Sequence, residues 1–186
     1  MTLTSLIQIA RENGCTITEQ ASMSAATTFK VGGPADLLVD IPTSEAAAAV
    51  IGCCARENIP WMMIGNGSNL LVGDKGIRGA VLRLEGRDAA PELKEDGRVY
   101  APAGISLQRL CLFARDHCLS GLEFAYGIPG SVGGAVYMNG GAYDGCMADV
   151  VVEAYCLTAD GKALTLSADD LNMSYRHTAL MERNLT

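Results

Sequence analysis

Long hydrophobic runs are missing from this sequence, and so is a basic N-terminal segment. No apolar stretch among its 186 residues approaches the roughly 18 residues that a membrane-spanning helix needs. Residues 1–14 carry no positive charge ahead of their apolar residues, whereas a secretory signal has such a charge. They have instead the pattern of an amphipathic helix that ends at Gly14. We therefore expect no membrane association.

Basic residues are few as well. Lys and Arg number 14 against 21 Asp and Glu, which gives a net charge of −7. No cluster of Lys and Arg forms the positive stripe with which proteins neutralise nucleic-acid phosphates, so we expect no nucleic-acid partner. An anionic small molecule is compatible with this charge, because backbone N–H groups bind anions without any lysine.

The spacing of cysteine and histidine also lacks the pattern of a metal site. The chain has seven cysteines without a Cys-x-x-Cys spacing, and its only histidines are His117 and His177. Metal sites need clustered ligands, so we expect none. Free cysteine is usually buried, and reduced thiols are typical of the cytoplasm. The sequence therefore predicts reduced core thiols in a cytoplasmic protein.

Helical and strand patterns alternate along the chain and predict an α+β protein with two lobes. The expected parts are an N-terminal helix and lead-in (residues 1–24), a first lobe of β-α-β-β order (25–85), an exposed connection or hairpin (86–97) and a second lobe (98–186). In the first lobe we expect strands at 36–41, 59–65 and 79–84. The helix between the first two strands has Thr43 or Ser44 as its expected cap.

The second lobe is expected to open with a strand over residues 99–104. A helix with Ser106 as its cap follows, and its one-face spacing of apolar residues continues to Cys118, with an end near Ser120. Residues 150–171 have the pattern of two strands joined across Asp160-Gly161, a dipeptide that tolerates the backbone conformation of a tight turn.

A glycine-rich turn, Gly65-Asn66-Gly67-Ser68-Asn69, comes directly after one of the predicted buried strands. Glycines allow a ligand to approach the backbone closely, and successive N–H groups in such a turn form a concavity that suits a phosphate or pyrophosphate. Ser68 and Asn69 add side-chain donors of little bulk. The alternative is an ordinary tight turn whose Asn and Ser side chains satisfy their own backbone.

A longer glycine-rich segment, residues 126–145, is also rich in apolar residues, unlike a flexible linker. A packed segment that lacks so many side chains predicts room for a large flat ligand, and Ser131 is placed to cap a short helix whose N-terminus favours an anion. The alternative is that the glycines only let chain segments cross. Neither segment is a P-loop, and Leu70 stands where a dinucleotide-binding fingerprint needs its third glycine.

Four segments, occurring in this order, together carry a resemblance to a known family. They are TTFKVGGPADLLV (27–39), IGNGSNLLV (64–72), GLEFAYGIPGSVGGAVYMNGGAY (121–143) and SYRHTAL (174–180). The chain resembles the bacterial UDP-N-acetylenolpyruvoylglucosamine reductases (UDP-N-acetylmuramate dehydrogenases), flavoenzymes of peptidoglycan synthesis. The resemblance implies a two-lobed FAD-binding domain of the vanillyl-alcohol-oxidase/PCMH type. Covalent relatives attach their flavin through a histidine in the first turn, and because this turn has none, FAD is expected to be non-covalent.

The resemblance assigns FAD binding to both glycine-rich segments. The residues concerned are Gly65, Asn66, Gly67, Ser68, Asn69, Leu70, Gly127, Ile128, Pro129, Gly130, Ser131, Gly133, Gly134, Asn139, Gly140, Ala142 and Tyr143. It further implies that NADPH passes a hydride to the flavin, which passes it to the enolpyruvyl group of a UDP-sugar. Arg176 matches the family's active-site arginine, where a bidentate cation stabilises an enolate-like intermediate.

In this family the proton-donating serine and the catalytic glutamate lie in a third domain, which we expect to follow the region covered by this chain. We therefore expect the 186 residues to bind FAD without completing the reaction, and their uncovered surface to favour self-association. Two alternatives remain open. One is another FAD-dependent oxidase or dehydrogenase of the same superfamily, and the other is a non-catalytic nucleotide-binding module.

Overall fold

The computed structural model describes residues 3–86 and 89–186, and their contacts form two compact units. Unit 1 comprises the chain up to Glu85 together with Leu157–Leu164 and Thr186, and unit 2 comprises Gly86–Cys156 and Thr165–Leu185. Positions 1–2 and 87–88 belong to the predicted N-terminal segment and the predicted connection, and they lie outside the described residues.

Unit 1 is built on a four-stranded sheet of order β1-β2-β4-β3. Its strands are β1 (Thr16–Ser22), β2 (Pro34–Ile41), β3 (Trp61–Ile64) and β4 (Ile77–Leu84). β1 is antiparallel to β2, whereas β2 and β3 both run parallel to β4. Parallel neighbours need a long crossover connection, and between β3 and β4 this connection is residues 65–76, which begin with the first glycine-rich turn.

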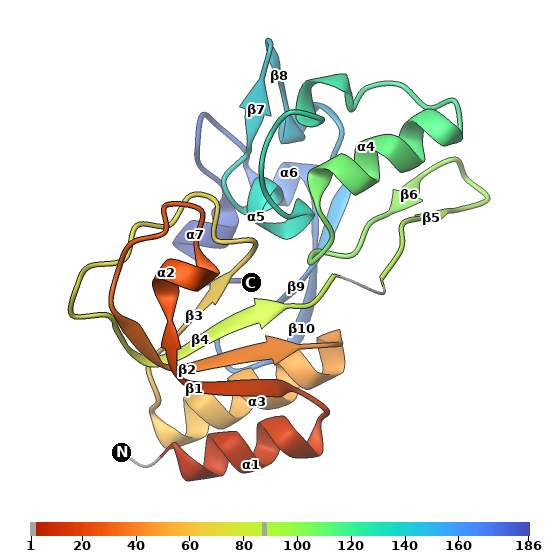
Figure 1. Ribbon diagram of the computed structural model, residues 1–186. Coiled ribbons are helices and arrows are strands. Elements are labelled where there is room, and N and C mark those ends of the chain that lie inside the picture. The colour runs from red at the N-terminus through yellow and green to blue at the C-terminus, as the bar shows by residue number, and fades with distance from the viewer. Residues whose placement is uncertain (1–2, 87–88) are drawn as a thin grey trace. The chain divides into compact units, whose positions relative to one another are not determined.

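Two helices, α1 (Thr4–Glu12) and α3 (Ser44–Glu57), cover one face of this sheet (Figure 1). Thr43 caps α3 by accepting the Ala46 N–H at 3.1 Å, so the predicted cap is confirmed. The core on this face contains fully buried Leu37, Ile41 and Leu82, and each such side chain contributes roughly 1.5–3 kcal/mol of burial free energy. The opposite face packs against α2 (Met23–Ala26).

Unit 2 has mainly short elements around its own core. They are β5 (Glu92–Leu93), β6 (Val99–Tyr100), α4 (Leu107–Asp116), η1 (Glu123–Ala125), α5 (Val132–Tyr137), β7 (Gly141–Ala142), β8 (Gly145–Cys146), η2 (Met147–Asp149), α6 (Ala168–Leu171) and α7 (Ala179–Glu182). The core joins Leu107 and Leu110 of α4 to Phe124 of η1 and Val132 of α5. Ser106 caps α4 by accepting the Arg109 N–H at 3.2 Å, as predicted.

The predicted hairpin after residue 150 consists of β9 (Glu153–Leu157) and β10 (Ala163–Ser167), which pair in a two-stranded sheet. Gly161 in its turn has φ +82°, and its N–H donates to the Thr158 carbonyl at 2.8 Å. The turn at Asp160-Gly161 is therefore confirmed. By its contacts this turn belongs to unit 1, although the sequence analysis counts all of residues 98–186 in the second lobe.

Three element assignments from the sequence were wrong. The lead-in contains β1, which has no alternating hydrophobic pattern because most of its side chains are polar and exposed. β6 ends at Tyr100 instead of continuing to Gly104. α4 ends at Asp116, since its C-cap His117 is followed by Cys118 at φ +57°, a left-handed conformation that stops the helix.

All seven cysteines are free, and five of them are buried: Cys15, Cys53, Cys54, Cys111 and Cys156. The prediction of core thiols is confirmed for these five, whereas Cys118 is exposed. Among the described residues, no group of three or more His, Cys, Asp or Glu side chains is arranged to hold a metal ion. No helix in the same residues combines the length and the hydrophobicity of a membrane span.

The burial of the thiols leads to a prediction about their reactivity. Burial raises the pKa of Cys54 to about 12, with a further contribution from neighbouring Cys53, so almost no reactive thiolate forms there at pH 8. We expect a disulfide reagent such as Ellman's reagent to modify Cys118 rapidly in the folded protein and Cys54 only after unfolding. Cys118→Ser is the matched control and should remove the rapid phase. Peptide mapping that finds Cys54 modified as fast as Cys118 would contradict this assignment of the core.

Candidate functional site

The first glycine-rich turn follows β3 in unit 1 and is held by a neighbouring segment of the same unit. The Thr28 N–H donates to the Gly67 carbonyl at 3.1 Å. Gly67 is buried and has φ +63°, and a Cβ at this position would lie 2.4 Å from the Ala26 carbonyl oxygen. Only glycine fits where residues 26–28 pass this closely. Close backbone packing therefore explains the glycine at position 67 without any ligand.

The same turn presents three consecutive backbone donors. Within the described residues, the N–H groups of Asn66, Gly67 and Ser68 donate to no acceptor. The alternative of a turn whose Asn and Ser side chains satisfy their own backbone stays a prediction, since Asn69 is not without a partner. Backbone N–H groups nearly always have partners, and successive unpaired ones form a concavity for an anion.

The second glycine-rich segment lies in unit 2 and uses many of its donors internally. In the first turn of α5, the Val132 N–H donates to the Ile105 carbonyl at 2.9 Å and the Gly133 N–H to the Ala103 carbonyl at 2.9 Å. The Gly134 N–H donates to Ser131 Oγ at 3.3 Å, which confirms Ser131 as the cap. The amides of Val132, Gly133 and Gly134 therefore have acceptors within the protein, and the expected anion at the N-terminus of α5 stays a prediction.

Two backbone N–H groups that precede α5 have no acceptor among the described residues. They belong to Gly130 and Ser131. Gly133 is explained by the fold, since a Cβ there would lie 2.8 Å from Ala103 Cβ, as the crossing-segment alternative predicts. Gly127 differs, because a Cβ at this position would meet nothing within 4 Å. The fold therefore explains the glycine at 133, whereas Gly127 is exposed and its predicted role in ligand binding stays a prediction.

Asn139 follows α5 and is almost fully buried, with 7% of its surface exposed. Its Nδ2 donates to the Ser174 carbonyl at 2.9 Å, and its Oδ1 accepts the Ala148 N–H at 2.9 Å. Both polar ends of this predicted cofactor-binding side chain therefore have partners within the protein.

Arg176 stands at the tip of a tight turn. The Ser174 N–H donates to the His177 carbonyl at 3.0 Å, and the His177 N–H donates to the Ser174 carbonyl at 3.2 Å. Tyr175 and Arg176 project from this turn, and both are exposed, Tyr175 by 90%. The Arg176 guanidinium carbon lies 5.8 Å from the centre of the Tyr175 ring. The guanidinium is therefore available to a ligand.

The other predicted residues divide between the two units. Leu70 belongs to unit 1, and Ile128, Pro129, Gly140, Ala142 and Tyr143 belong to unit 2. Tyr143 is 90% exposed at the end of the β7–β8 hairpin. Sequence reasoning missed Thr178, whose hydroxyl donates to the Tyr137 carbonyl at 2.7 Å from a fully buried position. Nothing in the local sequence marks this contact, since the two residues are 41 positions apart.

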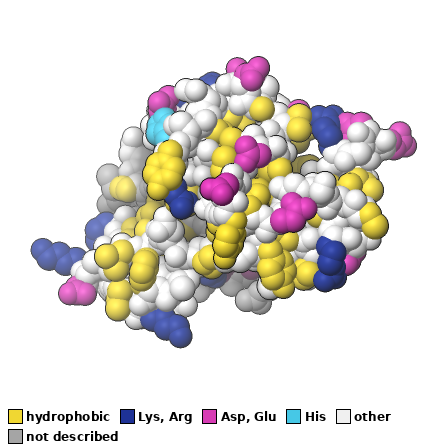
Figure 2. Space-filling model, turned by 90° about the horizontal axis from the view of Figure 1, so that it is seen from above, with side chains coloured by type: hydrophobic (Ala, Val, Ile, Leu, Met, Phe, Trp, Pro, Cys, Tyr) yellow, Lys and Arg dark blue, Asp and Glu magenta, His cyan; other side chains and the backbone are white. Residues whose placement is uncertain are grey.

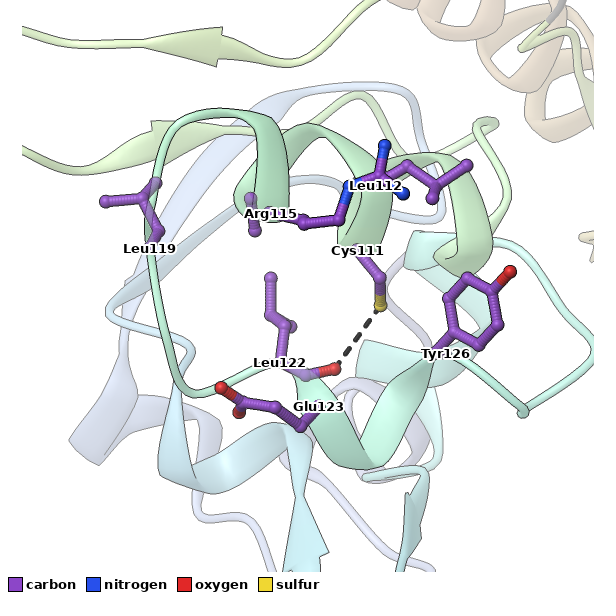
Figure 3. Close-up of a pocket in the computed structure, with 8 residues that line it drawn as sticks. Cys111, Leu112, Arg115, Leu119, Leu122, Glu123 and Tyr126 are labelled. Atoms are coloured by element: carbon purple, nitrogen blue, oxygen red, sulfur yellow. Dashed lines mark hydrogen bonds between the residues drawn. The ribbon is translucent and has the colours of Figure 1, made fainter.

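A hollow of about 370 Å³ lies between α4 and η1 in unit 2 (Figure 3). Leu112, Leu119 and Leu122 are among the residues that line it, and Cys111 Sγ donates to the Leu122 carbonyl at 3.3 Å. Its charged residues have protein partners, because Arg115 pairs with Asp116 and Glu123 accepts the Gly121 N–H. None of the predicted site residues lines this hollow.

Charges are mixed on the surface. On the face shown in Figure 2, Lys and Arg side chains are scattered and Asp and Glu lie among several groups of hydrophobic side chains. The large hydrophobic side chains that are most exposed include Leu71, Tyr143 and Tyr175. Basic side chains are therefore not concentrated on this face.

Comparison with known proteins gives a family match and close relatives. The model of a family described as an FAD binding domain matches residues 35–167. A UDP-N-acetylenolpyruvoylglucosamine reductase from Clostridium botulinum is 45% identical over 166 residues, which cover 89% of this chain and 54% of that protein. The one from Heliobacterium modesticaldum is 44% identical, with 94% of this chain and 55% of that protein covered. The chain thus spans about half the length of the curated relatives it matches.

Solved structures agree with the fold class. The UDP-N-acetylenolpyruvylglucosamine reductase of Thermus caldophilus has a TM-score of 0.72 and 35% identity, covering 88% of this chain and 56% of that one. The glucooligosaccharide oxidase of Acremonium strictum has a TM-score of 0.65 and 16% identity, covering 89% and 37%. The second likeness concerns the fold alone. The predicted α+β fold of the two-lobed, flavin-oxidase type is confirmed.

The first turn gives a prediction about stability. Gly67→Ala places a side chain at positive φ and against the Ala26 carbonyl, so we expect it to lower the free energy of unfolding by about 2 kcal/mol or more. Gly73→Ala is the matched control, because a Cβ at Gly73 meets nothing within 4 Å. We expect it to change stability by less than about 1 kcal/mol. Urea unfolding followed by circular dichroism measures both, and equal losses in the two variants would contradict the assigned role of Gly67.

Proposed function

The chain belongs to the FAD-binding domain family, and from this premise we propose that it is the FAD-binding part of a UDP-N-acetylenolpyruvoylglucosamine reductase. The observation that carries the proposal is the 45% identity to a reductase of that name over 89% of the chain. The unpaired amides of residues 66–68 support it from the structure, because they are a donor set that suits a pyrophosphate.

The donors of the described residues fit FAD at two places. In unit 1 the amides of Asn66, Gly67 and Ser68 would bind phosphate oxygens, and in unit 2 the amides of Gly130 and Ser131 are also unpaired. A Cβ at Gly127 would contact nothing within 4 Å, so the protein leaves this position open to a ligand. We retain the other predicted cofactor-binding residues as part of this proposal, except Asn139, whose side chain is bonded to Ser174 and Ala148.

We further propose that the FAD is held without a covalent bond. The oxidase from Acremonium strictum is described with a 6-S-cysteinyl, 8α-N1-histidyl FAD. In this chain neither residues 65–70 nor residues 127–143 contain cysteine or histidine. The free state of all seven cysteines also suits a reducing compartment, so the cytoplasm is the proposed location.

Arg176 is the proposed catalytic residue. FAD, when bound, supplies the hydride chemistry, with NADPH as the proposed donor. The exposed guanidinium of Arg176 has the geometry to bind a carboxylate through two N–H groups, and it would stabilise the negative charge that develops on an enolpyruvyl substrate. In this role the arginine orients the substrate and lowers the energy of the transition state.

The first test of the proposal is flavin binding. We expect the purified chain, incubated with FAD and freed of excess, to retain a yellow flavin with an absorbance band that unbound protein lacks. Acid precipitation should release all of this flavin to the supernatant, because no covalent bond holds it. The control is riboflavin, which lacks the pyrophosphate and should not be retained. Protein that stays colourless with saturating FAD would argue for a non-catalytic module.

The second test follows the two half-reactions in the FAD-loaded protein, prepared from the complete encoded polypeptide. Without oxygen, NADPH should bleach the flavin, and UDP-N-acetylenolpyruvoylglucosamine should restore its absorbance. Saccharides such as glucose are the control, because structural neighbours of this fold include sugar oxidases. Bleaching by saccharides but not by NADPH would replace the proposed function with that of an oxidase.

A further inference from the structure

The two backbone bonds between Ser174 and His177 close the turn that carries Arg176, but they do not fix it to the rest of the protein. Arg176 has φ +56°, a left-handed conformation that costs a residue other than glycine roughly 1 kcal/mol. Its guanidinium contacts the Tyr175 ring, and that ring is itself 90% exposed. A conformation of this kind persists only where the surrounding structure fixes it. The flanks of the turn must therefore supply the support.

On one flank the support comes from Asn139. Its Nδ2 donates to the carbonyl of Ser174, the residue where the turn begins, at 2.9 Å. Its Oδ1 is fixed in turn by the Ala148 N–H at 2.9 Å, so the amide group cannot rotate away without losing a second bond. Asn139 has 7% of its surface exposed and both of its bonds are partly buried, so water has limited access to them.

On the other flank the support comes from Thr178. Its hydroxyl donates to the Tyr137 carbonyl at 2.7 Å, and the residue is fully buried. Tyr137 is the last residue of α5, and Asn139 follows it by two positions. Both anchors of the turn therefore attach to the same short stretch, residues 137–139, at the end of the helix in the second glycine-rich segment.

We infer that Asn139 and Thr178 are positioning residues, which hold the Tyr175–Arg176 turn so that the guanidinium meets the substrate in one orientation. The inference rests on the proposed function of Arg176. It also changes the role of Asn139, whose side chain holds the arginine turn instead of binding the cofactor. Groups that act on a transition state must be held to within a fraction of an ångström, and a misplacement of 1 Å costs about 100-fold in rate.

Two substitutions remove the hydrogen bonds that anchor the turn while they keep the size and packing of each side chain. Asn139→Asp keeps the size of the side chain and the oxygen that accepts the Ala148 N–H, but replaces the donor to Ser174 with an acceptor. Thr178→Val keeps the shape and removes the hydroxyl, whereas Thr178→Ser keeps the hydroxyl and is the matched control. FAD content and circular dichroism report whether each variant folds.

The decisive measurement is the rate of each half-reaction by stopped-flow absorbance, using the FAD-loaded complete polypeptide. We expect Asn139→Asp and Thr178→Val to slow flavin reoxidation by UDP-N-acetylenolpyruvoylglucosamine by about 10- to 100-fold. Flavin reduction by NADPH should stay within about twofold of the original protein, because Arg176 acts on the enolpyruvyl group. Thr178→Ser should restore reoxidation. A variant that slows both half-reactions equally, or neither, overturns the inference.

A second measurement does not depend on the reaction. Amide hydrogen exchange at Ser174 and His177 reports whether the turn is anchored, and we expect faster exchange in Asn139→Asp and Thr178→Val than in Thr178→Ser. Unchanged exchange overturns the inference even if the enzyme is active. If the original protein fails to react with the enolpyruvyl substrate, the proposed function is wrong, and the exchange rates still decide whether Asn139 and Thr178 hold the turn.

Discussion

Backbone N–H groups in a packed protein need acceptors. The two glycine-rich segments of the chain differ in whether their amides find acceptors within the protein. In α5 the amides of Val132 and Gly133 are bonded to the carbonyls of Ile105 and Ala103, so they stabilise unit 2. In the turn after β3, the amides of residues 66–68 have no acceptor within the described residues. Phosphate oxygens are acceptors that suit such amides, and the proposed function depends on that complementarity.

The glycines serve this requirement indirectly. Gly67 lets residues 26–28 pass close to the turn, and the Thr28 N–H bonds the Gly67 carbonyl and so ties the turn to this segment. Gly133 permits a similar approach to Ala103. These two glycines therefore allow close backbone packing, and in the proposed function the neighbouring amides bind the ligand. Hydrogen bonds from Asn139 to Ser174 and from Thr178 to Tyr137 connect the flanks of the Arg176 turn to residues 137–139.

Features that depend on residues close together in the sequence were predicted correctly. Alternation of strands and helices indicated the α+β fold, and the caps at Thr43, Ser106 and Ser131 were predicted correctly because capping involves residues three positions apart. β1 was missed because an exposed polar strand has no hydrophobic alternation. The partners of the α5 amides were missed because residues 103–105 lie outside the segment. The bonds of Asn139 to Ser174 and of Thr178 to Tyr137 span 35 and 41 positions, so only the folded structure identifies them.

The central claim is that main-chain amides of the first turn bind the bridging phosphates of FAD. Its most direct test is a ¹⁵N–¹H correlation spectrum of the labelled chain with and without FAD, in which the Asn66, Gly67 and Ser68 amides are assigned. We predict that these three signals shift when FAD is added, and that ADP, which shares the pyrophosphate, shifts them too, whereas riboflavin does not. Bound FAD that leaves all three signals in place would contradict the account.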